Sequence, residues 1–89
     1  MKHIDYVPQG TCSRLISISG DNGRIQEVRF EGGCNGNLQG ISRLVRGMTY
    51  QEVIDCLHGI RCGMKRTSCP DQLCMAIRQL MAEEAADQK

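Results

Sequence analysis

Apolar and polar residues alternate along two stretches in the first third of the chain. In Cys12–Ser19 isoleucines alternate with serines, and in Arg24–Glu31 a valine and a phenylalanine face the same side. A period of two is typical of a strand with one buried face. The segment Gly20–Gly23 between them contains Asn-Gly, a strong hairpin dipeptide. The pattern predicts an antiparallel hairpin, to which His3–Val7 adds a possible third strand.

After Gly32 the apolar residues recur at spacings of three and four, which is typical of amphipathic helices. We expect one helix from about Leu38 to Arg46, a second from the cap Thr49 to about Leu57, and a third from about Pro70 to Ala85. The residues expected to face inward are Leu38, Ile41, Leu44, Val45, Val53, Ile54, Leu57, Leu73, Ile77, Leu80 and Met81.

Capping signals mark the ends of two of these helices. Thr49-x-x-Glu52 and Ser68-x-x-Asp71 have the spacing of N-terminal capping patterns, and Gly59 is suited to ending the second helix. Strands followed by helices predict an α+β fold: a small antiparallel meander of two or three strands, followed by three helices packed on one face. We expect residues 1–89 to form one such domain.

The composition argues against several classes of function. The net charge of +1 gives no broad reason to expect nucleic acid or an anionic membrane as partner. With one Phe, two Tyr and no Trp, few aromatics are present for bases to stack on. No segment approaches the ~20 apolar residues of a membrane span, and no apolar run follows the N-terminal lysine as in a signal peptide. No Ser-His-Asp set or carboxylate pair predicts hydrolytic or acid–base chemistry. Because no segment looks like a membrane span or a signal peptide, we expect a cytoplasmic protein.

Cysteines are the chemically most informative residues, because six of them occur among 89 positions. A domain of this size buries only about 60% of its unfolded surface, so a covalent or metal cross-link would add to its stability. In the reducing cytoplasm such cysteines are better interpreted as metal ligands or redox groups than as a disulfide framework.

Four of the cysteines occupy positions that suit a common site. Cys69 opens the third helix on its inward stripe, where unpaired amides and the helix dipole favour a thiolate. Cys34 precedes the first helix in the same way, Cys62 lies in a glycine-bounded loop shortly before Cys69, and Cys12 starts a strand. Four thiolates suit a tetrahedral zinc ion or an iron–sulfur cluster. Their separations match no standard zinc ribbon or ferredoxin pattern, so a packing role for Cys69 at the helix entrance stays open.

The remaining candidates have simpler interpretations. Cys56 and Cys74 lie inside helices and are expected to be core or boundary thiols. His58 is expected to interact with the negative end of the second helix rather than with a metal, and His3 to lie on the surface. Lys65-Arg66, close to the start of the last helix, leaves a phosphate site open.

The segment Thr67-Ser68-Cys69-Pro70-Asp71 spells the signature of the TSCPD domain family, and the resemblance covers nearly the whole chain. Its other motifs are Gly10-Thr11-Cys12-Ser13, Phe30-Glu31-Gly32-Gly33-Cys34, Asn37-Leu38-x-Gly40-Ile41, Leu44-Val45-x-Gly47 and Gly59-Ile60-x-Cys62-Gly63. The chain resembles the short stand-alone members. The family pattern includes the same four thiols that their positions favoured, and it leaves out Cys56, Cys74 and Met64.

The resemblance implies a cellular context. The family also occurs as a C-terminal domain of adenosylcobalamin-dependent (class II) ribonucleotide reductases, which implies a link to deoxyribonucleotide synthesis and a ribonucleotide reductase as partner. The chain is too short for the barrel that holds the radical site, so we do not expect an enzyme on its own. If it is one, the resemblance points to a ribonucleoside-diphosphate reductase-related oxidoreductase. A looser similarity is to the U-type iron–sulfur scaffold fold, which binds zinc or a nascent cluster through three cysteines.

Three functions stay open. The first is a metal-binding module, with zinc or an iron–sulfur cluster held by Cys12, Cys34, Cys62 and Cys69, that assists ribonucleotide reduction or works with an iron–sulfur assembly protein. The second is a thiol-redox shuttle with Cys62 and Cys69 as the exchanging pair. The third is a binding module in which the Lys65-Arg66 loop and the helix starts hold a nucleotide phosphate or another protein.

Overall fold

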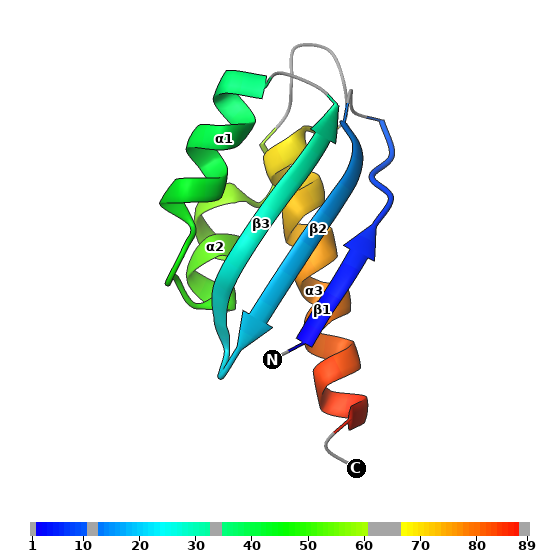
Figure 1. The fold of residues 1–89 in the computed structure, drawn as a ribbon, viewed down its shortest axis with the longest axis vertical. Helices are drawn as coiled ribbons and strands as arrows, with labels where there is room; N and C mark the ends of the chain where they lie inside the picture. The colour runs from blue at the N-terminus through cyan, green and yellow to red at the C-terminus, as the bar shows by residue number, and fades with distance from the viewer. Residues whose placement is uncertain (1, 11–12, 33–34, 61–66, 88–89) are drawn as a thin grey trace.

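The chain folds into a three-stranded sheet followed by three helices (Figure 1), which confirms the α+β prediction. The computed structural model describes residues 2–10, 13–32, 35–60 and 67–87. Its elements are β1 (Lys2–Tyr6), β2 (Ser13–Asp21), β3 (Arg24–Gly32), α1 (Asn35–Leu44), α2 (Tyr50–Leu57) and α3 (Cys69–Asp87).

The sheet is an antiparallel meander in the order β1-β2-β3. Asn22 and Gly23 form the turn between β2 and β3, with φ angles of 53° and 77°. Positive φ at both central residues is the geometry of the tight hairpin turn that matches strand twist, and it explains why Asn-Gly occurs here. The predicted hairpin and the third strand from the N-terminal segment are both confirmed.

The register determines which side chains face the helices. Ile4 lies opposite Ile18, and Ile16 lies opposite Phe30, so one face of the sheet is apolar. Between Ser19 and Gly20 of β2 the register with β3 shifts, because Gln26 is an additional residue on β3. A bulge of this kind changes which residues alternate inward. Ile25 is buried as a result, although the simple alternation in the sequence did not identify it.

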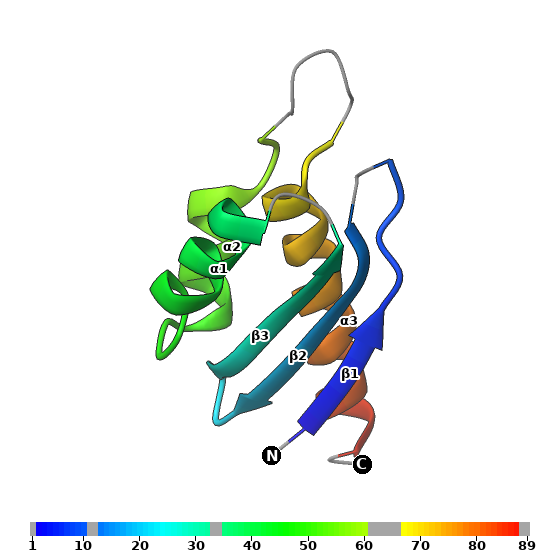
Figure 2. The same ribbon diagram turned by 45° about the horizontal axis from the view of Figure 1, so that its top comes forward.

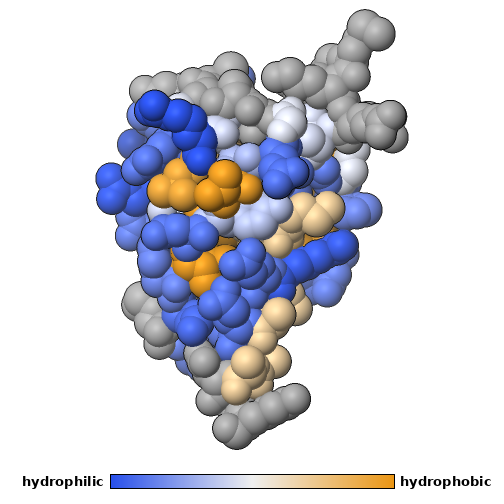
Figure 3. Space-filling model, turned by 90° about the vertical axis from the view of Figure 1, so that its right-hand side faces the viewer, coloured by the Kyte–Doolittle hydropathy of each residue, from blue (hydrophilic) through white to orange (hydrophobic). Residues whose placement is uncertain are grey.

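The three helices cover the apolar face of the sheet. Helix α3 lies against β1 and β2, α1 lies beside β3, and α2 packs on α3 (Figures 1 and 2). The core that they enclose consists of Ile4, Ile16, Ile18, Ile25, Val28, Val45, Tyr50, Val53, Ile54, Leu73, Cys74, Ala76, Ile77 and Leu80. On the side formed by β1 and α3, apolar side chains lie in separate patches between hydrophilic ones (Figure 3).

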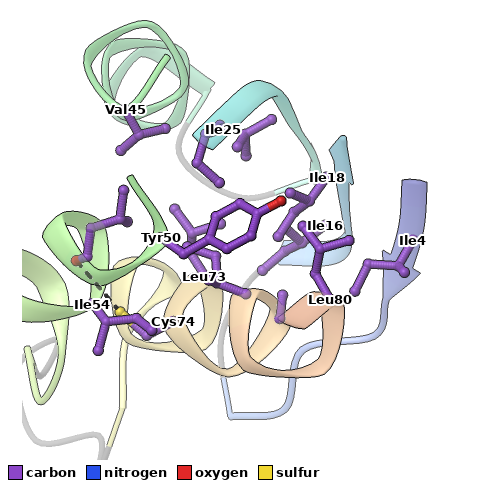
Figure 4. Close-up of a cluster of buried hydrophobic side chains, with 14 residues drawn as sticks. Ile4, Ile16, Ile18, Ile25, Val45, Tyr50, Ile54, Leu73, Cys74 and Leu80 are labelled. Atoms are coloured by element: carbon purple, nitrogen blue, oxygen red, sulfur yellow. Dashed lines mark hydrogen bonds between the residues drawn. The ribbon is translucent and has the colours of Figure 1, made fainter. Parts of the chain in front are cut away.

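Tyr50 is the one large aromatic side chain in this core, and Gly20 makes room for it. The Tyr50 ring lies between the isoleucines of the sheet and Leu73 of α3 (Figure 4). Its hydroxyl donates a hydrogen bond of 2.7 Å to Glu84. A Cβ at Gly20 would lie 1.9 Å from the Tyr50 hydroxyl oxygen, so no larger residue fits there without movement of the ring.

Local signals predicted one helix accurately. Thr49 and Glu52 form the complete capping box at the start of α2. His58 caps the other end, and Gly59 follows it with a φ of 81°. Helix α1 is displaced from its predicted bounds, since it begins three residues earlier and ends two residues earlier than the predicted Leu38–Arg46.

Two residues expected to face inward are exposed instead. Leu44 is 77% exposed and Met81 is 39% exposed. Leu44 is the last residue of α1, and Met81 lies roughly 100° around α3 from the buried Leu80. Helix α1 packs along the β3 side of the sheet, and the last turns of α3 extend past the sheet (Figure 1). Among the described residues, no helix combines the length and apolar character needed to cross a bilayer.

Candidate thiol site at the start of helix α3

Cys69 is the first residue of α3, and it is partly buried. Its Sγ lies 2.9 Å from the hydroxyl oxygen of Ser13, the first residue of β2. Ser13 is itself buried, with 4% of its surface exposed. The contact brings together residues 56 positions apart and places the start of β2 directly beside the start of α3.

The end of β3 meets the same point. Ser13 lies opposite Gly32 in the β2–β3 register. Ser13 follows Cys12 in the chain, and Gly32 precedes Cys34 by two residues. Cys12, Cys34 and Cys62 lie outside the described residues. The segments that flank Cys12 and Cys34 are nevertheless close neighbours of each other and of Cys69.

Asp71 ties the end of α2 to the start of α3. Its carboxylate accepts hydrogen bonds from the Gly59 N–H, at 2.8 Å, and from the Thr67 hydroxyl. The Ser68 hydroxyl donates to the Ile60 carbonyl at 2.6 Å and accepts from the Asp71 N–H at 3.2 Å. These bonds hold Gly59 and Ile60, before residues 61–66, close to Thr67 and Ser68 after them. Ile60 precedes Cys62 by two residues, so the flank of the fourth candidate thiol also lies near Cys69.

The capping prediction for Asp71 is correct only in part. Ser68 caps α3 as its spacing predicts, but the Asp71 carboxylate bonds to Gly59 and Thr67. The hydrogen bond from Thr67 and then that from Gly59 keep the pKa of Asp71 below its ordinary value, although burial acts in the opposite direction. Asp71 is therefore ionised, and its hydrogen bonds connect the end of α2 to the start of α3.

Gln72 connects the strand side of the site to α3. Its side-chain oxygen accepts from the Gln9 N–H at 3.1 Å and from the Tyr6 hydroxyl at 3.4 Å, while its amide donates to Thr67 at 3.1 Å. Ser13, Thr67 and Gln72 were not predicted as site residues. Ser13 and Thr67 belong to the two quoted motifs around Cys12 and Cys69, whereas no signal in the sequence marks Gln72.

The two thiols outside the predicted set differ in their surroundings. Cys74 is fully buried and lies 3.9 Å from the Val53 carbonyl (Figure 4). Burial and the nearby Asp71 carboxylate raise the pKa of Cys74 to about 11, so it stays a neutral core thiol, as predicted. Cys56 is exposed, so the prediction of a core or boundary thiol is wrong for this residue.

The described part of the site supplies one side chain that suits a thiophilic metal, the thiol of Cys69. Within residues 2–10, 13–32, 35–60 and 67–87, no three His, Cys, Asp or Glu side chains gather closely enough to hold a metal. Cys69 is the one member of the four-thiol prediction that lies there, and a thiolate suits zinc or an iron–sulfur cluster. The four-cysteine set itself stays a prediction.

A second polar cluster lies on the sheet face that the helices leave open. His3 Nδ1 lies 2.8 Å from the Ser19 hydroxyl, and His3 Nε2 lies 3.0 Å from Asp5, which also accepts from Ser17 at 2.7 Å. These bonds, first that from Ser17 and then that from His3, lower the pKa of Asp5. A hydrogen-bonded Ser-His-Asp set therefore exists that the sequence did not reveal, but it lies on the surface, as predicted for His3, and not in a pocket.

This cluster is a cross-strand hydrogen-bond ladder in a setting unsuited to acyl transfer. The His3 and Asp5 side chains are 54% and 58% exposed. Ser19 lies on the central strand, whose N–H groups are taken up by β1 and β3 on its two sides. A nucleophilic serine needs N–H groups directed at the developing oxyanion in a site that excludes water. We therefore assign the ladder to β1–β2 pairing.

Comparison with known proteins gives one match. A family model described as the TSCPD domain matches residues 1–81. No curated protein and no solved structure matches the chain significantly.

Proposed function

The chain belongs to the TSCPD domain family, and on that premise we propose that it is a small metal-binding module whose ligands are the thiolates of Cys12, Cys34, Cys62 and Cys69. The bound group is a zinc ion or an iron–sulfur cluster, since four thiolates can hold either one. When bound, it cross-links the ends of the sheet and helices and contributes directly to folding free energy.

The contact between Ser13 and Cys69 is the observation that supports this proposal most. It joins the start of β2 to the start of α3 at 2.9 Å. The pairing of Ser13 with Gly32 and the bond between Ser68 and Ile60 bring the flanks of the other two thiols to the same end of the molecule. The four cysteines are thus adjacent to segments that meet at one point, as a shared ligand set requires.

The described residues also supply the support that a thiolate site needs. The Ser13 hydroxyl can donate to the Cys69 sulfur and hold it in one orientation, which is the usual role of groups around metal ligands. The ties through Asp71 and Ser68 hold the ends of residues 61–66 in position.

We propose that the module assists ribonucleotide reduction or iron–sulfur cluster handling in the cytoplasm. Its partner is then a ribonucleotide reductase or a cluster assembly protein. This step rests on the family resemblance alone.

Metal analysis of protein purified anaerobically without chelator tests the proposal. We expect about one zinc ion, or the visible absorption of an iron–sulfur cluster, per chain, and a lower melting temperature after chelation. Cys69→Ala should lose the metal, and Cys56→Ala should retain it because Cys56 is exposed and outside the set. Metal-free protein that is fully folded, with an unchanged melting temperature in chelator, would refute the proposal.

A thiol-redox shuttle is the second candidate. The hydrogen bonds of Gly59 with Asp71 and of Ile60 with Ser68 hold the residues just before Cys62 close to those around Cys69, which suits an exchanging pair. In this mechanism one thiolate attacks a partner's disulfide, and the second displaces the partner's thiol. The two cysteines become a disulfide while the partner gains two electrons and two protons. Faster alkylation of Cys62 or Cys69 than of the exposed Cys56, in metal-free protein, would favour it.

A further inference from the structure

A groove lies between β3 and α1, and its residues differ from those that make the contacts of the thiol site. Its main part has a volume of about 270 Å³, and its residues are Val28, Arg29, Phe30, Leu38, Gln39, Ser42 and Arg43. A second hollow of about 170 Å³ adjoins it, shares Val28, Ser42 and Arg43, and adds Glu27 and Arg46. The two hollows form one groove along the strand and the helix.

The groove follows the edge of β3. Side chains in a strand alternate between the two faces of the sheet, yet the three consecutive residues Val28, Arg29 and Phe30 all line it. Three consecutive residues can do so only where the groove runs along the side of the strand. On the opposite wall, positions 38, 39, 42 and 43 form one face of α1, because 42 follows 38 and 43 follows 39 by four residues, about one helical turn.

The edge of β3 already accepts an extended segment at its start. The Ile25 N–H donates to the Met48 carbonyl at 2.9 Å, and the Gly47 N–H donates to the Ile25 carbonyl at 2.8 Å. This backbone pairing ends there, and the next carbonyl, that of Gln26, accepts from the Arg46 side chain at 3.4 Å. Within the described residues β2 is the one strand that pairs with β3. An edge strand directs alternate N–H and C=O groups outward, so the section beside the groove can pair with another chain.

The groove combines an apolar floor with positive charge. Val28 and Leu38 are buried beneath it, and Phe30 is partly exposed. Arg29, Arg43 and Arg46 line its walls against a single carboxylate, that of Glu27. Three of the eight arginines of the chain therefore line the groove, although the net charge of the whole chain is only +1.

We propose that this groove binds an extended peptide segment of a partner protein, which adds to β3 as a fourth strand. The peptide carries a short apolar run, of which alternate side chains contact Val28, Phe30 and Leu38, followed by acidic residues that pair with Arg29 and Arg43. Main-chain hydrogen bonds supply affinity in such strand addition, and the side-chain hollows supply specificity.

Charge favours such a peptide over a second copy of this chain. Two copies paired antiparallel through β3 would bring the arginine-lined walls of both molecules together, and like charges oppose that contact. An acidic peptide reverses this sign. It also uses the apolar floor, which a small inorganic anion would not.

Fluorescence anisotropy tests the proposal with a labelled Val-Ile-Val-Val-Asp-Asp-Glu-Glu peptide and the full chain. We expect saturable binding that Arg43→Glu weakens by about tenfold, because an attraction becomes a repulsion. Arg78→Glu on α3 changes the charge equally, away from the groove, and should leave binding unchanged. Of two peptides N-methylated at one or the other set of alternate residues, one should not bind, since it lacks the N–H groups that face β3.

Amide chemical shifts measured by NMR locate the contact. The largest changes are expected at Val28, Arg29 and Phe30, with little change at Val7, which is exposed on the opposite side of the sheet. Equal binding by Arg43→Glu, equal binding of both N-methylated peptides, or changes outside the groove would overturn the proposal. So would self-association of the chain through the same amides without peptide, because it would assign the edge to a second copy.

Discussion

Replacement of Asp71 is expected to loosen the connection between the end of α2 and the start of α3. Asp71 is 7% exposed, and its carboxylate accepts hydrogen bonds from Gly59 and Thr67. Hydrogen bonds to a charged group contribute roughly 1.5–3 kcal/mol each. Asp71→Ala removes both, and after partial relaxation we expect a loss of about 3–4 kcal/mol. Asp71→Asn keeps one acceptor and the shape, so we expect a loss of about 1–2 kcal/mol.

The pH dependence gives a sharper test of the same carboxylate. Its pKa in the folded chain lies below the ordinary 3.8, so ionised Asp71 stabilises the fold above that pH. This contribution is lost as the pH falls through the lower folded-state pKa. The stability difference between the wild type and Asp71→Asn should therefore be constant from pH 7 to about pH 5 and shrink below about pH 4.

Urea unfolding followed by far-UV circular dichroism measures these differences. With a slope of about 1 kcal/mol per molar urea for a small domain, Asp71→Asn should shift the midpoint by about 1–2 M. Asp55→Asn removes an equal charge from an exposed position on α2 and should change stability by less than about 0.5 kcal/mol. The reasoning is refuted if Asp71→Ala behaves like this control, or if the difference for Asp71→Asn persists unchanged at pH 3.

Two glycine substitutions of equal size should have opposite effects in thermal and urea unfolding. Gly20→Ala places a Cβ against Tyr50 and disturbs its bond to Glu84, so we expect a loss of about 2–4 kcal/mol, which Tyr50→Phe reduces in a double-mutant cycle. Gly40→Ala in α1 meets no atom within 4 Å and should stabilise by about 0.5–1 kcal/mol. A neutral Gly20→Ala would contradict the close packing of Tyr50.

Features set by residues near in the chain were predictable from the sequence. The Asn22-Gly23 turn and the capping box of Thr49 and Glu52 depend on backbone geometry within four residues, and both occur as expected. The alternation in the strands and the periodicity of the helices then determined the α+β class.

Two kinds of feature could not be predicted from the sequence: how much of a helix its neighbours cover, and the register between strands. A helical wheel gives the direction of Leu44 and Met81, but not how much of each helix its neighbours cover. The bulge at Gln26 changes the alternation in β3, and the sequence does not signal it. The contact of His3 with Ser19 arises from the β1–β2 register over sixteen residues.

The candidate site was predictable in part. The position of Cys69 at a helix start follows from local capping and is confirmed. The contact with Ser13 depends on tertiary packing across 56 residues, as does the link from Gln72 to Gln9 across 63. The predicted ligands Cys12, Cys34 and Cys62 lie outside the described residues, and their role as ligands stays a prediction.

Helix α3 covers the sheet, yet it follows every strand in the chain. Ile4, Ile16 and Ile18 pack in the cluster that α3 completes with Leu73, Ile77 and Leu80. During synthesis, the meander emerges from the ribosome before the helix that shields it. The nascent chain therefore carries an uncovered apolar surface until α3 is released. Folding is completed after translation of this helix, and the intermediate before that point is the form most prone to aggregation or chaperone capture.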